Sequence, residues 1–377
     1  MVVVLVALVG LLAVSSLAID AGLIWGARTQ LQNAADASAL AGAARLVDAS
    51  GATVTISAAV DASVELAGTN RAGSYTSLDL LPDDVTPGNW SVDSETFDST
   101  VSLLDPDLVN AVRVTARMDG VSNGPVQAVF SRVIGLSSFD VTATATAYVG
   151  FAGGVGRGEV ELPIAIDCCK LKGPECKDDY CETLAANPPN ACDLEDAQDD
   201  GITSVTCLQF QANEEQNACW TNFDSESPSV NANDLRQVVR SGNVTQISGN
   251  YEVFLDNGDK TNVIREISDR FYGDGAHSSD RSGVDRYSPF DGRSDSWVTV
   301  VPVVECQTED HCSGGGTGTI VGFACFEIRE IVVVPDKVIR GRFLCESDPL
   351  FATCDIGLST TGGLDFGLRA DIPVLVR

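Results

Sequence analysis

The sequence predicts an α+β protein with a long N-terminal apolar α-helix, an α/β head, and a disulfide-rich, mainly β C-terminal domain. Three observations predict this fold class. No charged side chain precedes Asp20, segments beyond residue 108 alternate between apolar and polar residues, and all twelve cysteines follow residue 167. The expected boundaries are 1–46 for the helix, 47–150 for the head, 151–158 for a glycine-rich linker and 159–377 for the C-terminal domain.

The first helix is expected to run from residue 2 to Leu46, because no proline interrupts it. Ser15 and Ser16 are the only polar side chains before Asp20. Nineteen helical residues span about 28 Å, close to the hydrocarbon thickness of a bilayer. A carboxylate is costly at bilayer depth, so Asp20 marks either the aqueous edge of a membrane or a paired site inside an assembly.

Small residues recur every four positions along this helix, in two groups of three. Such spacing allows two helix backbones to approach closely, so these positions are the predicted assembly contacts. An ordinary single-span anchor with incidental small residues is the alternative. A cleaved signal peptide is disfavoured, because no basic segment precedes the apolar block. The predicted assembly residues are Ala18, Gly22, Gly26, Ala34, Ser38 and Gly42.

The head is expected to combine helices and strands. Residues 54–66 carry apolar side chains on one helical face, and Gly68 follows them. Val109–Met118 and Phe139–Gly150 alternate with a period of two, which is typical of half-buried strands. Pro125–Ile134 is predicted to be a short helix closed by Gly135. Four glycines in the 151–158 segment then indicate a flexible linker.

The C-terminal domain is expected to be built from strands. An Asp-Asn-Gly-Asp sequence at residues 256–259 indicates a hairpin turn. The predicted strands are Val160–Ile166, Asn250–Leu255, Ser296–Val304, Gly318–Val334, Lys337–Leu344 and Leu368–Val376.

The cysteines predict a disulfide framework, because their number is even and the N-terminus is of an export type. Seven lie in one cluster and five in a second, so complete pairing requires at least one bridge between clusters. A metal site at Cys306, His311 and Cys312 is the weaker alternative, because no CxxC motif occurs. The disulfide cysteines are Cys168, Cys169, Cys176, Cys181, Cys192, Cys207, Cys219, Cys306, Cys312, Cys325, Cys345 and Cys354.

The formal net charge of -29 argues against nucleic acid and against anionic membrane surfaces as partners. Catalysis is not expected either. The only histidines, His277 and His311, lie outside apolar frames, and no Gly-x-Ser-x-Gly motif occurs.

Calcium is the one ligand that the sequence suggests. Asp196, Gln198 and Asp200 precede Gly201 with the spacing of the start of an EF-hand loop. The twelfth position is Cys207 rather than glutamate, so the motif is incomplete. A second acidic loop runs over residues 269–295. For each loop a plain solvated acidic segment is the alternative, and no other cofactor is expected.

The run from Ala18 to Ala44, AIDAGLIWGARTQLQNAADASALAGAA, resembles the N-terminal signature of TadE/TadG-like proteins of tight-adherence (Tad, Flp-type) pilus systems. This resemblance implies a pilin-like head. It also implies partners among copies of the chain itself through the N-terminal helix, other Tad pilus-assembly proteins, and a membrane before assembly. The chain departs from typical pilins at Leu5, where they carry glutamate, and from the family in its dense cysteines.

The expected function is therefore that of a structural subunit of an extracellular Tad-like pilus or filament, placed at the cell surface via the inner membrane. One alternative is a TadG-like pilus-assembly protein in the periplasm with an inner-membrane anchor. The other is a stalked, calcium-dependent adhesin.

Overall fold

The computed structural model describes residues 2–376 with these gaps: 47–54, 93, 102–107, 174–175, 177, 187–190, 194–203, 211–215, 224–229, 248–250, 273–296, 306–315, 335–336, 346, 355 and 357–358. For residues 2–16, 133–134, 193, 204 and 352 it describes the backbone alone. The chain forms two compact units. Unit 1 comprises residues 1–149 and 373–377, and unit 2 comprises residues 150–372.

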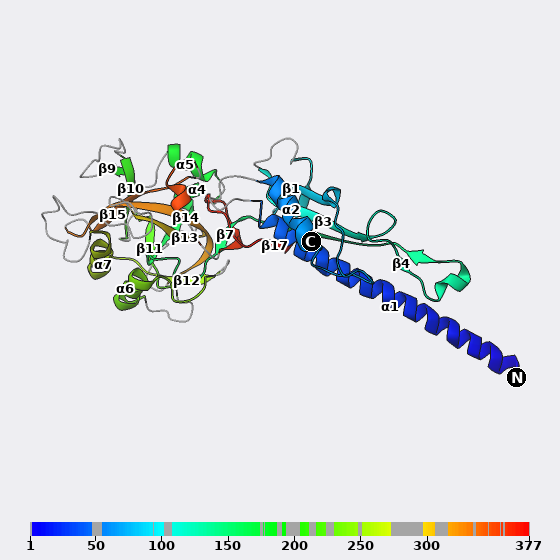
Figure 1. The fold of residues 1–377 in the computed structure, drawn as a ribbon. Helices are drawn as coiled ribbons and strands as arrows, with labels where there is room; N and C mark the ends of the chain where they lie inside the picture. The colour runs from blue at the N-terminus through cyan, green and yellow to red at the C-terminus, as the bar shows by residue number, and fades with distance from the viewer. Residues whose placement is uncertain are drawn as a thin grey trace. The chain divides into compact units, whose positions relative to one another are not determined.

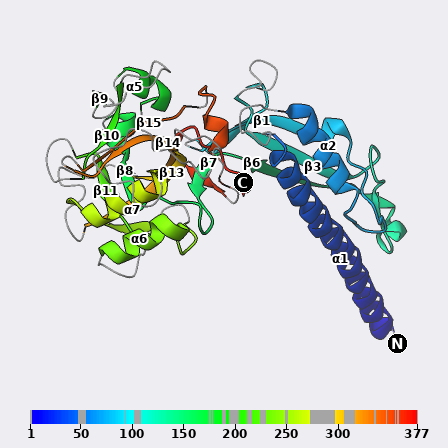
Figure 2. The same ribbon diagram turned by 60° about the vertical axis from the view of Figure 1, so that its left-hand side comes forward.

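Two helices cover the sheet of unit 1. Helix α1 runs over Val2–Ala43 and α2 over Ile56–Ala67, close to the predicted bounds. Alanine and leucine on one side of α1, including Ala27, Leu31 and Ala35, are buried against the sheet and α2. Figures 1 and 2 show that α1 continues past the end of the sheet toward its N-terminus.

The sheet of unit 1 has the strand order β17-β6-β3-β1-β2, and all its pairs are antiparallel. Strands β3 and β6 pair along their whole length, and the buried residues of both pack beneath α1. The predicted alternation of these two strands is confirmed. The strands are β1 (Val85–Ser91), β2 (Thr96–Asp98), β3 (Ala111–Met118), β6 (Val141–Tyr148) and β17 (Val374–Val376), and the short helix η1 (Pro82–Asp84) precedes β1.

A short hairpin projects from this sheet beside α1 (Figure 1). Strands β4 (Val126–Gln127) and β5 (Ser138–Phe139) pair, and the 3₁₀ turn η3 (Ser131–Ile134) lies between them. The predicted helix over Pro125–Ile134 is therefore wrong except for its last turn. The strand pairing takes up the flanking backbone groups, and Gly135, with φ of 92°, ends the turn.

Unit 2 is built on an eight-stranded sheet of order β11-β8-β13-β14-β15-β10-β9, with β12 paired to β14. Every residue of β13 is buried, which is typical of a central strand covered on both faces. The mainly β character predicted for this part is confirmed. The strands are β8 (Ile164–Asp167), β9 (Ala191–Asp193), β10 (Ser204–Leu208), β11 (Ala218–Trp220), β12 (Glu252–Leu255), β13 (Trp297–Val304), β14 (Gly316–Val332) and β15 (Val338–Phe343).

Two amphipathic helices that the sequence analysis missed, α6 (Ala232–Ser241) and α7 (Thr261–Tyr272), pack on one core of unit 2. The Asn231 side chain caps α6 by accepting from the Asn233 and Asp234 backbone N–H groups. The segment 256–259 leads from β12 into α7, so it is not a hairpin turn. Shorter helices are α4 (Cys168–Lys172), α5 (Tyr180–Ala186) and η5 (Phe351–Thr353).

The glycine-rich segment expected to be a linker instead begins with a strand. Strand β7 (Phe151–Gly154) pairs with β16 (Thr360–Gly363) inside unit 2. A Cβ placed on Gly153 would lie 2.5 Å from the backbone nitrogen of Gly363, so only glycine allows this approach. Glycine here serves close strand packing rather than flexibility.

Disulfide bonds cross-link segments of unit 2. Four bridges join Cys168–Cys176, Cys181–Cys345, Cys192–Cys207 and Cys325–Cys354. The bridge between Cys181 and Cys345 connects the two clusters, as the odd count in each cluster predicted. Cys169 and Cys219 are also disulfide-bonded, whereas Cys306 and Cys312 lie outside the described residues.

Candidate assembly surface

The two groups of small residues on α1 lie on different sides of the helix. Each four-residue step advances about 40° beyond a full turn. Gly42 is therefore rotated by about 240° around the helix axis from Ala18, in the direction in which the helix winds. Burial agrees with this geometry. Ala18 and Gly22 are exposed and Gly26 is half-buried, whereas Ala34, Ser38 and Gly42 are buried. The spacing that suggested one continuous stripe therefore makes two surfaces.

The second group, Ala34, Ser38 and Gly42, is enclosed by the chain itself. A Cβ placed on Gly42 would overlap Ser63 Oγ of α2 and lie 3.0 Å from the Ala59 carbonyl oxygen. This part of α1 thus uses its small residues to bring α2 close. Only the first group remains open to another molecule.

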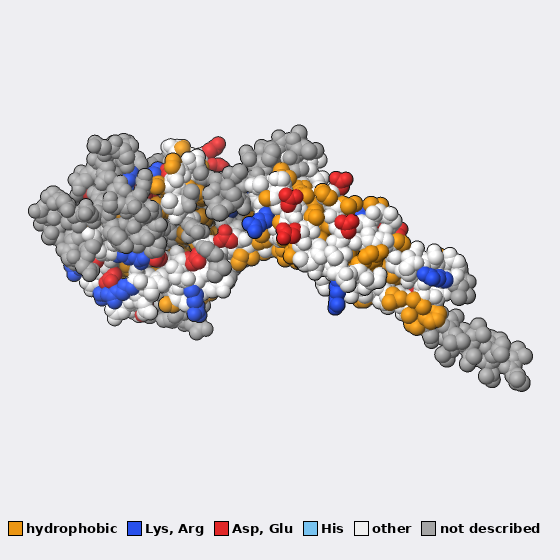
Figure 3. Space-filling model, viewed as in Figure 1, with side chains coloured by type: hydrophobic (Ala, Val, Ile, Leu, Met, Phe, Trp, Pro, Cys, Tyr) orange, Lys and Arg blue, Asp and Glu red, His pale blue; other side chains and the backbone are white. Residues whose placement is uncertain are grey.

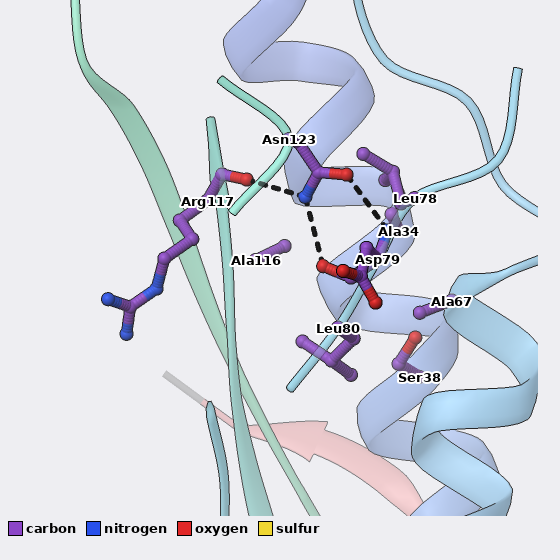
Figure 4. Close-up of a pocket in the computed structure, with 9 residues that line it drawn as sticks. All are labelled: Ala34, Ser38, Ala67, Leu78, Asp79, Leu80, Ala116, Arg117 and Asn123. Atoms are coloured by element: carbon purple, nitrogen blue, oxygen red, sulfur yellow. Dashed lines mark hydrogen bonds between the residues drawn. The ribbon is translucent and has the colours of Figure 1, made fainter. Parts of the chain in front are cut away.

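Ala34 and Ser38 also line a small cavity of about 10 Å³ beside Leu78, Leu80 and Ala116 (Figure 4). Asn123 closes its rim, since the side-chain amide donates to the carbonyl oxygens of Asp79 at 3.0 Å and of Arg117 at 2.9 Å. The Ser38 hydroxyl is buried and has no hydrogen-bond partner.

The first group faces away from the body of unit 1. Among the residues that the structure describes, no atom lies within 4 Å of a Cβ placed on Gly22 or Gly26. Exposed apolar side chains lie on either side, and Trp25 is 76% exposed. Small residues between larger apolar ones form a shallow groove on the helix surface, and a second helix can pack closely in such a groove.

Asp20 has a partner within the chain. Its side chain is only 2% exposed, and its carboxylate accepts from the backbone N–H groups of Val129 at 2.9 Å, Phe130 at 3.2 Å and Ser131 at 2.6 Å. The Ser131 hydroxyl donates to it as well. The hydrogen bond from the Ser131 hydroxyl has the largest effect on the pKa of Asp20, and the backbone hydrogen bonds add to it. Together they lower that pKa to about 2, although burial alone would raise it.

This interaction fastens the hairpin to α1. Asp20 was expected to be either at an aqueous edge or paired within an assembly, and the structure pairs it with residues 129–131 instead. Nothing in the local sequence could have identified that partner, because Ser131 is 111 residues away.

Exposed apolar side chains gather where the described side chains of α1 begin, and Figure 3 shows hydrophobic surface there. Both α1 and the hairpin contribute to this surface, which we name the apolar collar. Its members are Leu17, Ile19, Leu23, Trp25, Val129, Phe130 and Leu136.

The predicted calcium oxygens Asp196, Gln198 and Asp200 lie outside the described residues, as does most of the 269–295 loop. Where side chains are described, no three His, Cys, Asp or Glu residues group as metal ligands would. No helix in the described part of the chain is long and apolar enough to cross a membrane; the side chains of residues 1–16 are not in that part.

Comparison with known families assigns the N-terminal part of the chain. Residues 1–45 match the family model described as Flp pilus-assembly TadE/G-like. Residues 41–147 match the model described as Tad-like Flp pilus-assembly. No curated protein and no solved structure matches the chain. The resemblance seen in the Ala18–Ala44 run is thus confirmed, and the second match ends within β6, at residue 147.

Proposed function

We propose that this chain, whose first 147 residues are a Tad-like pilus-assembly region, is a structural subunit of an extracellular Tad-like pilus or filament. The subunits assemble through the outward face of α1. One observation carries the proposal: Gly22 and Gly26 lie on a helix surface that none of the described residues covers.

The chemistry of that face suits helix–helix packing. Small residues allow two helix axes to approach to about 8 Å, the short end of the usual range. Ile19, Leu23 and Trp25 then come out of water, at about 25 cal/mol for each Å² of apolar surface buried. Residues 2–16 extend the same helix, and their sequence carries no charge.

The remainder of unit 1 holds this part of the helix in place. The C-terminal half of α1 is packed on α2, β3 and β6, and the Asp20 carboxylate ties the N-terminal half to the hairpin. A helix fixed at two points presents its outward face without a large loss of conformational freedom on assembly.

A second candidate is the periplasmic, membrane-anchored pilus-assembly protein. Its support is the uncharged sequence before Asp20 and the disulfide-bonded unit 2, which suits an oxidising compartment. The calcium-dependent adhesin has no support among the described residues.

The test is a pair of substitutions on the outward face. Gly22→Leu and Gly26→Leu should each abolish assembly without lowering the thermal stability of the chain, because no described atom lies within 4 Å of a Cβ at either position and leucine has the higher helix propensity. Ala21→Leu is the matched control, since it places the same side chain at an exposed position of the same turn, about 100° away.

Negative-stain imaging and sedimentation of the purified chain report the result. Fibres that disappear with Gly22→Leu and persist with Ala21→Leu support the proposal. Discrete particles in the unsubstituted protein favour the anchored assembly protein. Fibres at normal yield in both glycine variants would remove this face from the mechanism.

A further inference from the structure

The stretches that form the apolar collar carry few carboxylates. Residues 17–35 and 120–139, which are bounded by Asp36, Asp119 and Asp140, contain one carboxylate, Asp20, and two arginines, Arg28 and Arg132. Both arginines are exposed, whereas Asp20 is buried and held by four donors. The exposed surface here is therefore apolar and cationic, on a chain whose formal net charge is -29.

The collar is also held as one surface. The backbone N–H groups of Val129, Phe130 and Ser131 bind Asp20, so the tip of the hairpin lies against α1. The side chains of Val129 and Phe130 are left exposed by that arrangement. Apolar groups from two separate elements thus lie together, beyond the end of the sheet (Figures 1 and 3).

We infer that the β4–β5 hairpin is a membrane-binding loop, which seats the collar at the headgroup level of an anionic lipid bilayer beside α1. Tryptophan and phenylalanine favour this boundary, where an apolar body and a wet surface meet. Arg28 and Arg132 would lie among lipid phosphates. Asp20, which would otherwise oppose insertion, has its lone pairs occupied by the hairpin backbone.

In a single subunit before assembly, the two exposed arginines of the collar are complemented by anionic lipid. In the filament proposed above, helix packing through α1 would replace the lipid contact of Ile19, Leu23 and Trp25. Carboxylates elsewhere in the chain are repelled by the same lipid surface, so the collar would be the part of unit 1 that contacts it. The expectation that the net charge excludes anionic membranes therefore does not apply to this end of unit 1.

The test places a reporter on the hairpin of the full-length protein. Phe130→Trp, in a Trp25→Phe background, leaves three further tryptophans, all of them buried. With vesicles of phosphatidylcholine and phosphatidylglycerol, the indole at position 130 should shift its emission to the blue and be quenched by brominated acyl chains. Leu375→Trp in the same background is the control, because Leu375 and Phe130 are both 42% exposed.

Quenching at position 130 and none at 375 is the expected result. A reporter at 130 that stays unquenched while the protein floats with the vesicles would overturn the inference. So would a blue shift at position 130 that appears without lipid in the Gly22→Leu variant and grows with protein concentration, because the hairpin would then bind another copy of the chain independently of the α1 packing.

A second measurement tests the charge. Arg28→Gln and Arg132→Gln should each lower partition onto anionic vesicles about fivefold and leave binding to phosphatidylcholine alone unchanged. Equal binding of these variants and the parent would contradict the role of the arginines. Gly22→Leu should leave the signal at position 130 intact, so failure of filament assembly and failure of lipid binding are distinguishable.

Discussion

The two halves of α1 are both rich in small and apolar residues, but one half is covered by the rest of unit 1 and the other is exposed. Over residues 27–43 most of the alanines are buried, and Gly42 allows α2 to approach closely. Over residues 17–26 the same spacing faces away from the chain, with no described atom within 4 Å of a Cβ at Gly22. The difference teaches that helical phase, more than composition, decides which small residues stabilise the fold and which are free for a partner.

The largest expected effect separates the two halves by stability. Gly42→Leu should unfold unit 1 or destabilise it by about 3 kcal/mol or more, because the new side chain overlaps α2. Gly22→Leu should not lower the free energy of unfolding. Denaturant unfolding followed by circular dichroism measures both, and equal losses in the two variants would remove the distinction.

Truncating one leucine in each half should reproduce the contrast without overpacking. Leu31 is fully buried, so Leu31→Ala should cost about 3 kcal/mol. Leu23 is exposed, so Leu23→Ala should cost about 0.5 kcal/mol or less. A large loss for Leu23→Ala would show that the N-terminal half is covered within the monomer.

Acid should loosen the hairpin from α1. The folded pKa of Asp20, about 2, is below its ordinary value of 3.8, so its stabilising effect is complete above pH of about 4. That effect is lost as the pH falls toward 2, because protonation removes the charged acceptor. The protection factors of the Val129, Phe130 and Ser131 amides, which compare the observed exchange rates with the intrinsic rates at the same pH, should fall over this range.

Asp20→Asn provides the control for that experiment. Its exchange at the same three amides should be fast already at neutral pH and should not show the acid-dependent step. If the parent protein keeps full protection at pH 2, the Asp20 carboxylate does not hold the hairpin.

The smallest effect concerns the buried hydroxyl on the inward face. Ser38→Ala removes a polar atom that has no partner, so stability should stay the same or rise by about 1 kcal/mol. A clear loss, measured by thermal unfolding, would mean that water in the neighbouring cavity satisfies this hydroxyl.

Parts of this structure could be predicted from sequence, because they follow local periodicity. Strands β3, β6 and β13 alternate or form apolar runs, and they lie where expected. Helix α6 was equally visible, since Asn231 precedes it and Leu235, Val238 and Val239 have helical spacing, yet its polar composition concealed it.

The candidate site was only half predictable. The sequence analysis identified the small residues. To assign them to two faces of the helix, one must know both the rotation per residue and which side of α1 the sheet covers, and the second of these comes only from the structure. The hairpin and its bond to Asp20 depend on contacts across 111 residues, which no local pattern records. The glycines at 153 and 154 signalled close packing between strands, and flexibility was the wrong interpretation of them.

The most direct test of the outward face is cross-linking in the assembled state. Gly22→Cys should form disulfide-linked dimers on oxidation, because a bridge requires Cα atoms within about 7 Å, and the proposed packing brings them there. Ala21→Cys, in the same turn, should give few. The predicted result is a dimer band on a non-reducing gel for Gly22→Cys and not for Ala21→Cys. Equal cross-linking at both positions, or none at position 22 in intact fibres, would contradict the proposal that α1 packs through this face.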